Sequence, residues 1–281
     1  MASLSLGIIG CGSMGSAIAL GTLKASLSAQ CAVENSSSTH TFTVGVYDLA
    51  ETARPAIEQA GGTWWKSPTE LAAACDIVLL AVKPYQVKAV IQEIRPVLTT
   101  GKTLLSIAAG QPLSALRQAL GGTCPAVQIM PNTPAMIGEG AFALCLDDPS
   151  LPDDRKNAVC NLFAALGTVF IMPEHKMNAF SAVAGCGPAY VYAMMDAIIE
   201  AAVTLGFTRD EATRMTACLF KGSARMVEET GLAPGVLHGQ VTSPGGMTIV
   251  GTNHLARTAV RGHIIDAVLA ANARGKEMEK E

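Results

Sequence analysis

"GIIGCGSMGSAI" at residues 7–18 decides the fold of the first half of this chain. It holds a G-x-G-x-x-G motif, made by Gly10, Gly12 and Gly15, between an apolar strand and an apolar helix. In that setting the first glycine makes the turn, the second lets a pyrophosphate approach, and the third permits close helix packing. The context favours a dinucleotide site over a purely structural turn. The predicted cofactor contacts are Gly10, Cys11, Gly12, Ser13 and Met14.

Short β-rich runs alternate with helical patterns through the first half of the chain. Such alternation predicts a parallel, doubly wound sheet with helices on both faces, the Rossmann type of α/β fold. The predicted strand and helix pairs are LSLGIIG with Met14–Ala25, TFTVGVYD with Glu51–Gly61, DIVLLAV with Gln86–Leu98, and TLLSIAAG with Pro112–Leu120, followed by the strand AVQIMPN.

The pattern changes near Phe170, and beyond Met172 only helical periodicity remains. We therefore expect a dinucleotide-binding domain over residues 1–172 and an all-α domain over residues 173–281. The predicted helices are Glu174–Ala184, Pro188–Leu205, Arg209–Thr230, Ala233–Val241 and one from Met247 to the C-terminus. The serine-rich segment Cys31–His40 is predicted to be a surface loop before the second strand.

Composition restricts the partners of this protein. The 281 residues are 49% hydrophobic and carry a formal net charge of −3 without a basic run, so neither nucleic acid nor an anionic membrane is favoured. Eight cysteines show no CxxC pair and no metal-ligand spacing with the five histidines, which indicates reduced thiols in a cytoplasmic protein without a metal site. The apolar stretch Ala189–Gly206 contains Asp196 and Glu200, so we interpret it as a buried or subunit-interface helix.

Asp48 ends the second predicted strand and is the candidate for the acidic residue that binds the adenosine ribose. A carboxylate there repels a 2′-phosphate, which favours NADH. The nearest arginine, Arg54, comes about one and a half helical turns later. The alternative is that Asp48 only caps the following helix.

Three further strand ends should meet the same cleft, because ligands of open α/β sheets bind beyond the carboxyl ends of the strands. Lys83 either neutralises a phosphate or is a solvated loop lysine. Asn132, between two prolines in "MPNTP", either presents its amide to the nicotinamide or belongs to a rigid connector. The cofactor contacts predicted from these strand ends are Ala81, Val82, Lys83, Pro84, Ala108, Ala109 and Asn132.

A second glycine-rich turn, "QVTSPGGMTIVG" at residues 240–251, lies far from the first. Glycines leave backbone N–H groups unshielded, and a Ser-Pro step is a good helix start, so this turn is suited to hold an anion. By itself the pattern is equally consistent with an ordinary helix cap.

Six motifs together resemble the pyrroline-5-carboxylate reductases, which make L-proline. In chain order they are GIIGCGSMGSAI, AVKPYQV, SIAAG, MPNTPAMIGEGA, AVAGCGPAYVY and VTSPGGMTI. The resemblance covers nearly the whole chain. It implies a Rossmann domain, a helical dimerisation domain interlocked with its twin, NADPH or NADH as cofactor, and a cyclic imine carboxylate as substrate; rings of dimers also occur in the family.

The resemblance also implies roles at the second turn. Ser243, Gly245, Gly246 and Met247 would hold the substrate carboxylate, and the Thr248 hydroxyl would reach the ring nitrogen as the catalytic group. The chain departs from the family pattern in having Cys186 where Ser or Ala is usual, Met247 where Thr is common, and Ala256 and Thr258-Ala259 where a Glu and a Gly-Gly pair are common. The last departure concerns where the helix breaks.

Other readings compete with this one. A reductase of a related cyclic imine would share the same motifs. A β-hydroxyacid dehydrogenase needs a catalytic lysine in a glycine-led motif, and Lys176 and Lys221 lack that context. A non-catalytic dinucleotide sensor would not need the SPGG turn and Thr248.

Overall fold

The computed structural model describes residues 3–31 and 40–279. The chain forms two compact units: residues 1–185 together with 272–281, and residues 186–271. This division follows Gly185, within a continuous helical segment, whereas the sequence pattern changed near residue 172. Most of the Cys31–His40 loop predicted from the sequence lies outside the described residues.

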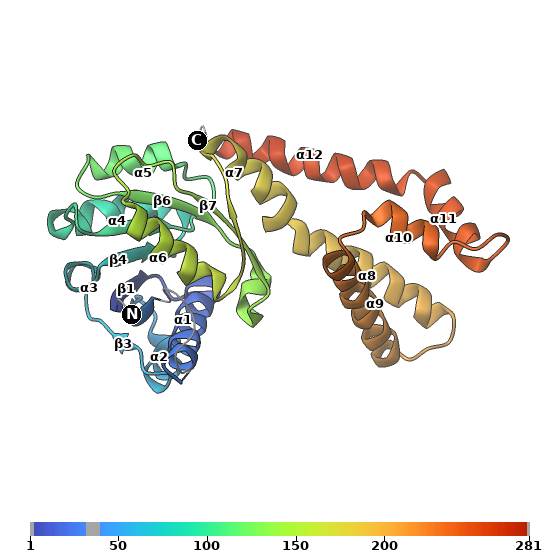
Figure 1. The fold of residues 1–281 in the computed structure, drawn as a ribbon, viewed down its shortest axis with the longest axis horizontal. Helices are drawn as coiled ribbons and strands as arrows, with labels where there is room; N and C mark the ends of the chain where they lie inside the picture. Colours follow the sequence, from blue (N-terminus) through green and yellow to red (C-terminus); the bar gives the residue numbers. More distant parts are fainter. Residues whose placement is uncertain (1–2, 32–39, 280–281) are drawn as a thin grey trace. The chain divides into compact units, whose positions relative to one another are not determined.

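The first unit is built on one eight-stranded sheet of order β3-β2-β1-β4-β5-β6-β7-β8 (Figure 1). Its strands are β1 (Ser3–Ile9), β2 (Thr41–Tyr47), β3 (Thr63–Trp64), β4 (Ile77–Leu80), β5 (Thr103–Ser106), β6 (Ala126–Met130), β7 (Gly140–Cys145) and β8 (Gly167–Ile171). The order of the first six strands is that of a doubly wound dinucleotide-binding fold, which confirms the predicted fold class.

The sheet is not wholly parallel, and here the sequence prediction was incomplete. β7 runs antiparallel to β6, and β8 parallel to β7. The segment from Pro131 to Glu139 contains only the short helix η4 (Thr133–Ile137). A parallel strand needs a crossover of about a dozen residues or more, so β7 returns antiparallel. The elements β3, α3, β7, α6 and β8 were not predicted.

Helices cover both faces of the sheet. In the first unit they are α1 (Ser13–Cys31), η1 (Glu51–Ala53), α2 (Arg54–Gln59), α3 (Pro68–Ala74), η2 (Pro84–Gln86), α4 (Val87–Ile94), η3 (Arg95–Val97), α5 (Leu113–Leu120), α6 (Asp153–Ala164) and α7 (Glu174–Phe180), followed by the π-turn η5 (Ser181–Gly185).

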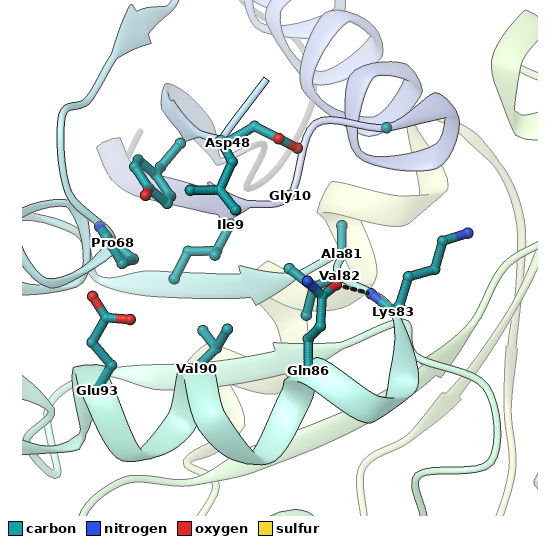
Figure 2. A pocket seen from close by; sticks show the side chains of 13 residues that line it. Ile9, Gly10, Asp48, Pro68, Ala81, Val82, Lys83, Gln86, Val90 and Glu93 are labelled. Atoms are coloured by element: carbon teal, nitrogen blue, oxygen red, sulfur yellow. Dashed lines mark hydrogen bonds between the residues drawn. The ribbon is translucent and has the colours of Figure 1, made fainter. Parts of the chain in front are cut away.

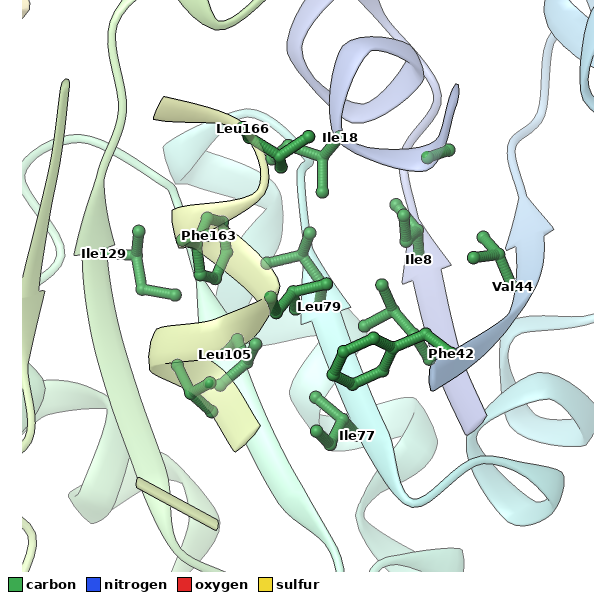
Figure 3. Close-up of a cluster of buried hydrophobic side chains, with 14 of the residues drawn as sticks. Ile8, Ile18, Phe42, Val44, Ile77, Leu79, Leu105, Ile129, Phe163 and Leu166 are labelled. Atoms are coloured by element: carbon green, nitrogen blue, oxygen red, sulfur yellow. The ribbon is translucent and has the colours of Figure 1, made fainter. Parts of the chain in front are cut away.

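Alternating strand residues supply two separate cores. In β4, Ile77 and Leu79 belong to one buried cluster and Val78 and Leu80 to the other, as period-two side-chain alternation requires. Figure 3 shows the first cluster, with Phe163 of α6 among the side chains of the strands. Because both faces of the sheet are buried, the strands of its centre read as continuous apolar runs.

The second unit is entirely helical. It consists of α8 (Gly187–Thr204), α9 (Arg209–Thr230), α10 (Pro234–Gln240), α11 (Met247–Arg257) and the greater part of α12 (Val260–Met278), whose end returns to the first unit at Asn272. Several of its large apolar side chains are exposed, including Leu219, Leu255 and Leu269. The segment Glu174–Thr204 is long and apolar enough to cross a membrane by length and composition, but Met177 near its start is buried in the core of the first unit.

The single helix predicted from Met247 onward is wrong, because the chain breaks between α11 and α12. Ala259 lies at φ 54°, the one non-glycine residue with positive φ among those described. Thr258 and Ala259 donate their N–H groups to His254 and Ala256 carbonyls and end α11. The left-handed conformation costs an L-residue roughly 1–2 kcal/mol, which is the reason a glycine suits this break.

Replacing Ala259 with Gly should raise the free energy of unfolding by about 1 kcal/mol, since relief of the left-handed conformation outweighs the entropy of an added glycine. Chemical denaturation measures this. The matched control is Ala256→Gly within α11, which should lower stability by about 1 kcal/mol. Destabilisation by both changes to the same extent would contradict the strain at Ala259.

Candidate active site

The turn between β1 and α1 packs closely against the backbone at the ends of β2 and β4. Gly10 has φ 100°, and a Cβ on it would lie 2.7 Å from the Ala81 carbonyl atoms. A Cβ on Gly15 would lie 2.1 Å from the Gly10 carbonyl oxygen. The N–H of Gly10 donates to the Tyr47 carbonyl, and the N–H of Ala81 to Ile9. Two of the three glycines are therefore required by packing alone.

Gly12 differs from its two neighbours in the motif. Nothing lies within 4 Å of the position its Cβ would occupy, its φ is not in the left-handed region, and the residue is exposed. The folded protein therefore gives no reason for a glycine at this position. A ligand that approaches the backbone at the start of the 19-residue helix α1 does give one, and a helix N-terminus suits a phosphate.

Asp48 holds this turn from the end of β2. Its Oδ2 accepts a hydrogen bond from the Cys11 N–H, and its Oδ1 accepts one from the Ala50 N–H at 2.8 Å. The second bond closes the turn before η1, and η1 has no side-chain cap hydrogen bond, so the structure does not support the capping alternative. Each carboxylate oxygen retains acceptor capacity, so ribose binding is still open to it. The nearest arginine, Arg54, pairs with Glu51 and Glu58, and the preference for NADH remains a prediction.

A cavity of about 290 Å³ lies beside the turn, at the carboxyl ends of β1, β2 and β4 (Figure 2). Gly10, Gly12, Asp48, Ala81, Val82 and Lys83 line it, six of the residues predicted from sequence. The other lining residues are Ile9, Tyr47, Leu49, Pro68, Gln86, Val90 and Glu93. Open-sheet ligands bind at this position, where neighbouring crossovers run in opposite directions.

Sequence reasoning missed part of this wall although a signal was present. Gln86, Val90 and Glu93 are spaced four and three residues apart on a predicted helix, which places them on one face. Figure 2 shows Val90 and Glu93 projecting from α4 on the side where Ile9 and Pro68 lie. The Gln86 side chain accepts a hydrogen bond from the Lys83 N–H at 3.1 Å and so fixes the backbone where Lys83 leaves the strand.

The other predicted cofactor residues lie around the same edge but do not line this cavity. Ser13 and Met14 begin α1, Cys11 is buried in the turn, and Pro84 begins η2. In the loop after β5, Ala108 is buried and Ala109 is exposed.

Asn132 follows β6 and has protein partners for both ends of its amide. Its Oδ1 accepts from the Ala141 N–H at 2.9 Å, and its Nδ2 donates to the Ala184 carbonyl at 3.1 Å. These bonds tie η4, β7 and the π-turn together, which favours the connector reading of "MPNTP". Contact with the nicotinamide remains a prediction.

The second glycine-rich turn belongs to the helical unit and ends at the start of α11. Gly245 has φ 68°, and the Gly246 N–H donates to the Ser243 carbonyl at 3.2 Å. A Cβ on Gly246 would lie 2.5 Å from the Ser243 Oγ. Ser243, Gly245, Met247 and Thr248 are exposed. The Gly246 N–H is thus used inside the turn, and the missing side chain at this position leaves room for the Ser243 hydroxyl.

Four buried thiols of the first unit are poorly suited to nucleophilic chemistry. Burial raises the pKa of Cys75, Cys124 and Cys145 to about 11, and burial also raises the pKa of Cys11. A thiol with so high a pKa is protonated at neutral pH. Within residues 3–31 and 40–279, no three His, Cys, Asp or Glu side chains come together as a metal site.

Known proteins match this chain over nearly its whole length. A family model for pyrroline-5-carboxylate reductase dimerisation matches residues 174–278, and one for the coenzyme F420-dependent NADP oxidoreductases matches residues 5–110. The chain is 35% identical to the pyrroline-5-carboxylate reductase of Glycine max, over 98% of this chain and 96% of that one. It is 34% identical to the Escherichia coli reductase over 98% of both.

The chain belongs to the pyrroline-5-carboxylate reductase family.

Solved structures of the family agree with this assignment. The Plasmodium falciparum pyrroline carboxylate reductase, a structure with NADP bound, is 30% identical with a TM-score of 0.85 and 98% coverage of both chains. A Streptomyces aurantiacus imine reductase (TM-score 0.55) and a Mycobacterium tuberculosis 3-hydroxyisobutyrate dehydrogenase (0.50) are each 15% identical and share the fold only. Lys176 and Lys221, considered for the dehydrogenase reading, are exposed on α7 and α9.

Replacing Gly12 with Val should weaken dinucleotide binding about tenfold or more, a loss of at least ~1.4 kcal/mol, while leaving the melting temperature unchanged. The added side chain meets no protein atom but occupies the space open to a phosphate. Titration of cofactor fluorescence measures the affinity. Gly10→Ala is the matched control, because its Cβ would collide with the Ala81 backbone and lower stability. Unchanged cofactor affinity in Gly12→Val would show that the phosphate binds elsewhere.

Proposed function

We propose that this protein reduces 1-pyrroline-5-carboxylate to L-proline with NADPH or NADH. The observation that carries the proposal is full-length similarity to reductases of that name in a chain that retains both glycine-rich turns. The first turn has an open backbone position at Gly12 beside the cavity, which supports cofactor binding. The second supports binding of a carboxylate.

The substrate is a five-membered imine that carries a carboxylate. At the start of α11 the first backbone N–H groups lack partners within the helix, and the helix dipole favours negative charge there. Since the Gly246 N–H bonds to Ser243, the donors assigned to the carboxylate are the Ser243 hydroxyl and the N–H groups of Gly245 and Met247. Gly246 keeps the turn compact enough for them to converge.

Thr248 is the residue assigned to the ring nitrogen. Bound NAD(P)H supplies the hydride for the C=N carbon. As the imine becomes an amine, the Thr248 hydroxyl donates a hydrogen bond to the nitrogen and stabilises it. A neutral hydroxyl is a weak acid, so water completes the proton delivery. The protein's contribution is mainly the positioning of two reactants, which needs no nucleophile.

The assembly proposed is an interlocked homodimer formed through residues 174–278, with a ring of dimers as the larger form. The exposed apolar side chains of the helical unit support a subunit partner. The low net charge supports the absence of nucleic-acid and membrane partners, and the scattered cysteines without a CxxC pair support a cytoplasmic enzyme. We assign Glu174–Thr204 to the subunit interface. A related cyclic imine, or a β-hydroxyacid, is the alternative substrate.

Steady-state assays of NADH and NADPH oxidation test the activity. We expect NAD(P)H oxidation with 1-pyrroline-5-carboxylate and none without substrate, and no reduction of NAD+ or NADP+ when a β-hydroxyacid is supplied instead. The assays should span pH values from about 6 to 9, the range in which general acids normally act. A folded dimer that turns over none of the imine with either cofactor would disprove the proposal.

Replacing Thr248 with Ala should lower kcat by about 10- to 1000-fold, the range for one lost transition-state donor, and leave the imine KM nearly unchanged. Gly246→Val should show the opposite pattern: it displaces the Ser243 hydroxyl, so the imine KM rises while cofactor affinity stays constant. A kcat within about twofold of wild type in Thr248→Ala would remove the threonine from the mechanism.

A further inference from the structure

The cavity beside the first glycine-rich turn corresponds to one half of a dinucleotide. Its volume of about 290 Å³ is at the lower end of the range of about 300–1000 Å³ that is usual for ligand pockets. Asp48, the residue predicted for the adenosine ribose, lines it, whereas Asn132, the residue predicted for the nicotinamide, does not. The cavity is therefore suited to the adenosine half of the cofactor.

One carboxylate in this cavity has no role in holding the fold. Glu93 lines the wall from α4, and the residue is exposed. The Asp48 oxygens accept backbone N–H groups, and the Gln86 side chain accepts the Lys83 N–H. Within the described part of the chain, the Glu93 carboxylate has neither a hydrogen bond nor an ion pair. An exposed glutamate is usually just solvated, but this one lies in the wall of a site for an anionic cofactor, where it repels phosphate.

Glu93 lies at the end of this wall that is farther from Lys83, the residue predicted to neutralise a phosphate. Figure 2 shows Gln86, Val90 and Glu93 in this order along the helical wall, with Lys83 beside Gln86. Seven residues separate Gln86 from Glu93, which corresponds to roughly 10 Å along a helix axis. Val90 and Pro68 line the cavity near Glu93 and offer apolar contacts to a flat ring. The base of the adenosine half therefore fits this end of the wall.

The chemistry of a carboxylate restricts what Glu93 can bind there. An ionised carboxylate is an acceptor only, so its partner must be an N–H or O–H donor. The phosphates of the cofactor are negative, and the ribose hydroxyls are assigned to Asp48. The remaining donor is the amino group on C6 of adenine. In hypoxanthine the same position holds a carbonyl oxygen, an acceptor that a carboxylate repels.

We propose that Glu93 is a specificity-determining residue of the cofactor site, whose carboxylate accepts a hydrogen bond from the 6-amino group of adenine. The inference rests on the proposed use of NADH or NADPH. Both cofactors carry the same base, so this selection is separate from the effect of Asp48 on a 2′-phosphate. Glu93 takes no part in hydride transfer and acts only in binding.

Glu93→Gln tests this contact through binding of NADH and of its deamino analogue, in which hypoxanthine replaces adenine. Cofactor fluorescence gives both Kd values in the absence of imine. Wild type should bind NADH about tenfold more tightly than the analogue, near the lower end for a hydrogen bond to a charged group because Glu93 is exposed. In Glu93→Gln this ratio should fall to within about twofold, since an amide can accept from the amino group or donate to the carbonyl. Glutamine has nearly the size and helix propensity of glutamate, so the fold should be retained.

Glu70→Gln is the matched control. Glu70 is exposed on α3, two residues after Pro68, and does not line the cavity. The substitution removes the same charge as Glu93→Gln. Loss of a nearby negative charge should change the affinities for the two dinucleotides alike, because both are anionic. Glu70→Gln should therefore keep the wild-type ratio, which separates direct contact with the base from general electrostatics. If the chain binds NADPH more tightly, the same ratio is measured with NADPH and deamino-NADPH.

Equal wild-type affinities for the two dinucleotides would overturn the proposal, and so would an unchanged ratio in Glu93→Gln or binding of neither dinucleotide. The outcome is independent of the reductase function, because no imine is present. A chain that prefers adenine through Glu93 but reduces no imine keeps this inference and loses the proposed reaction. A chain that reduces the imine and binds both dinucleotides equally loses only the role of Glu93.

Discussion

The close approach of the β1–α1 turn to the end of β4 is the constraint on which the first unit depends. Gly10 lies so near the Ala81 backbone that no side chain fits, and Gly15 lies against the Gly10 carbonyl. Asp48 then fixes the Cys11 N–H from the end of β2. Three strand ends are thereby locked around one turn, and the position of the cavity follows from that locking rather than from any flexible loop.

The glycines of the two turns have different structural roles, and the sequence motif alone does not distinguish these roles. Gly10 and Gly15 are needed by the protein's own packing, whereas the position at Gly12 is open and leaves the backbone beside the cavity accessible to a ligand. In the second turn, Gly245 supplies a left-handed conformation and Gly246 makes room for the Ser243 hydroxyl. At Gly12 the sign of binding is the combination of an open position, the cavity wall and the start of α1.

Much of the fold could be predicted because its signals are local. The glycine motif, the apolar strands and the helical periodicity beyond residue 172 gave the fold class and six of the cavity residues. β7 and β8 were missed because the direction of β7 is set by the shortness of the connection through η4, a property of the tertiary fold. The resemblance marked Thr258-Ala259 as a departure that concerns the helix break, but one continuous helix was predicted because an alanine there carries no turn signal.

The hydrogen-bond partners of polar side chains could not be predicted from the sequence. They change the interpretation of the predicted cofactor residues most. From sequence, Asp48 and Asn132 were assigned to the cofactor because of where they end their strands. In the folded chain the Asp48 oxygens accept backbone N–H groups, and both ends of the Asn132 amide bond to the backbone. A buried or half-buried polar group finds a partner wherever the fold offers one. A polar residue at a strand end can therefore serve to fix the backbone around the site. It can contact the ligand as well only if its side chain keeps a donor or acceptor that no backbone group uses.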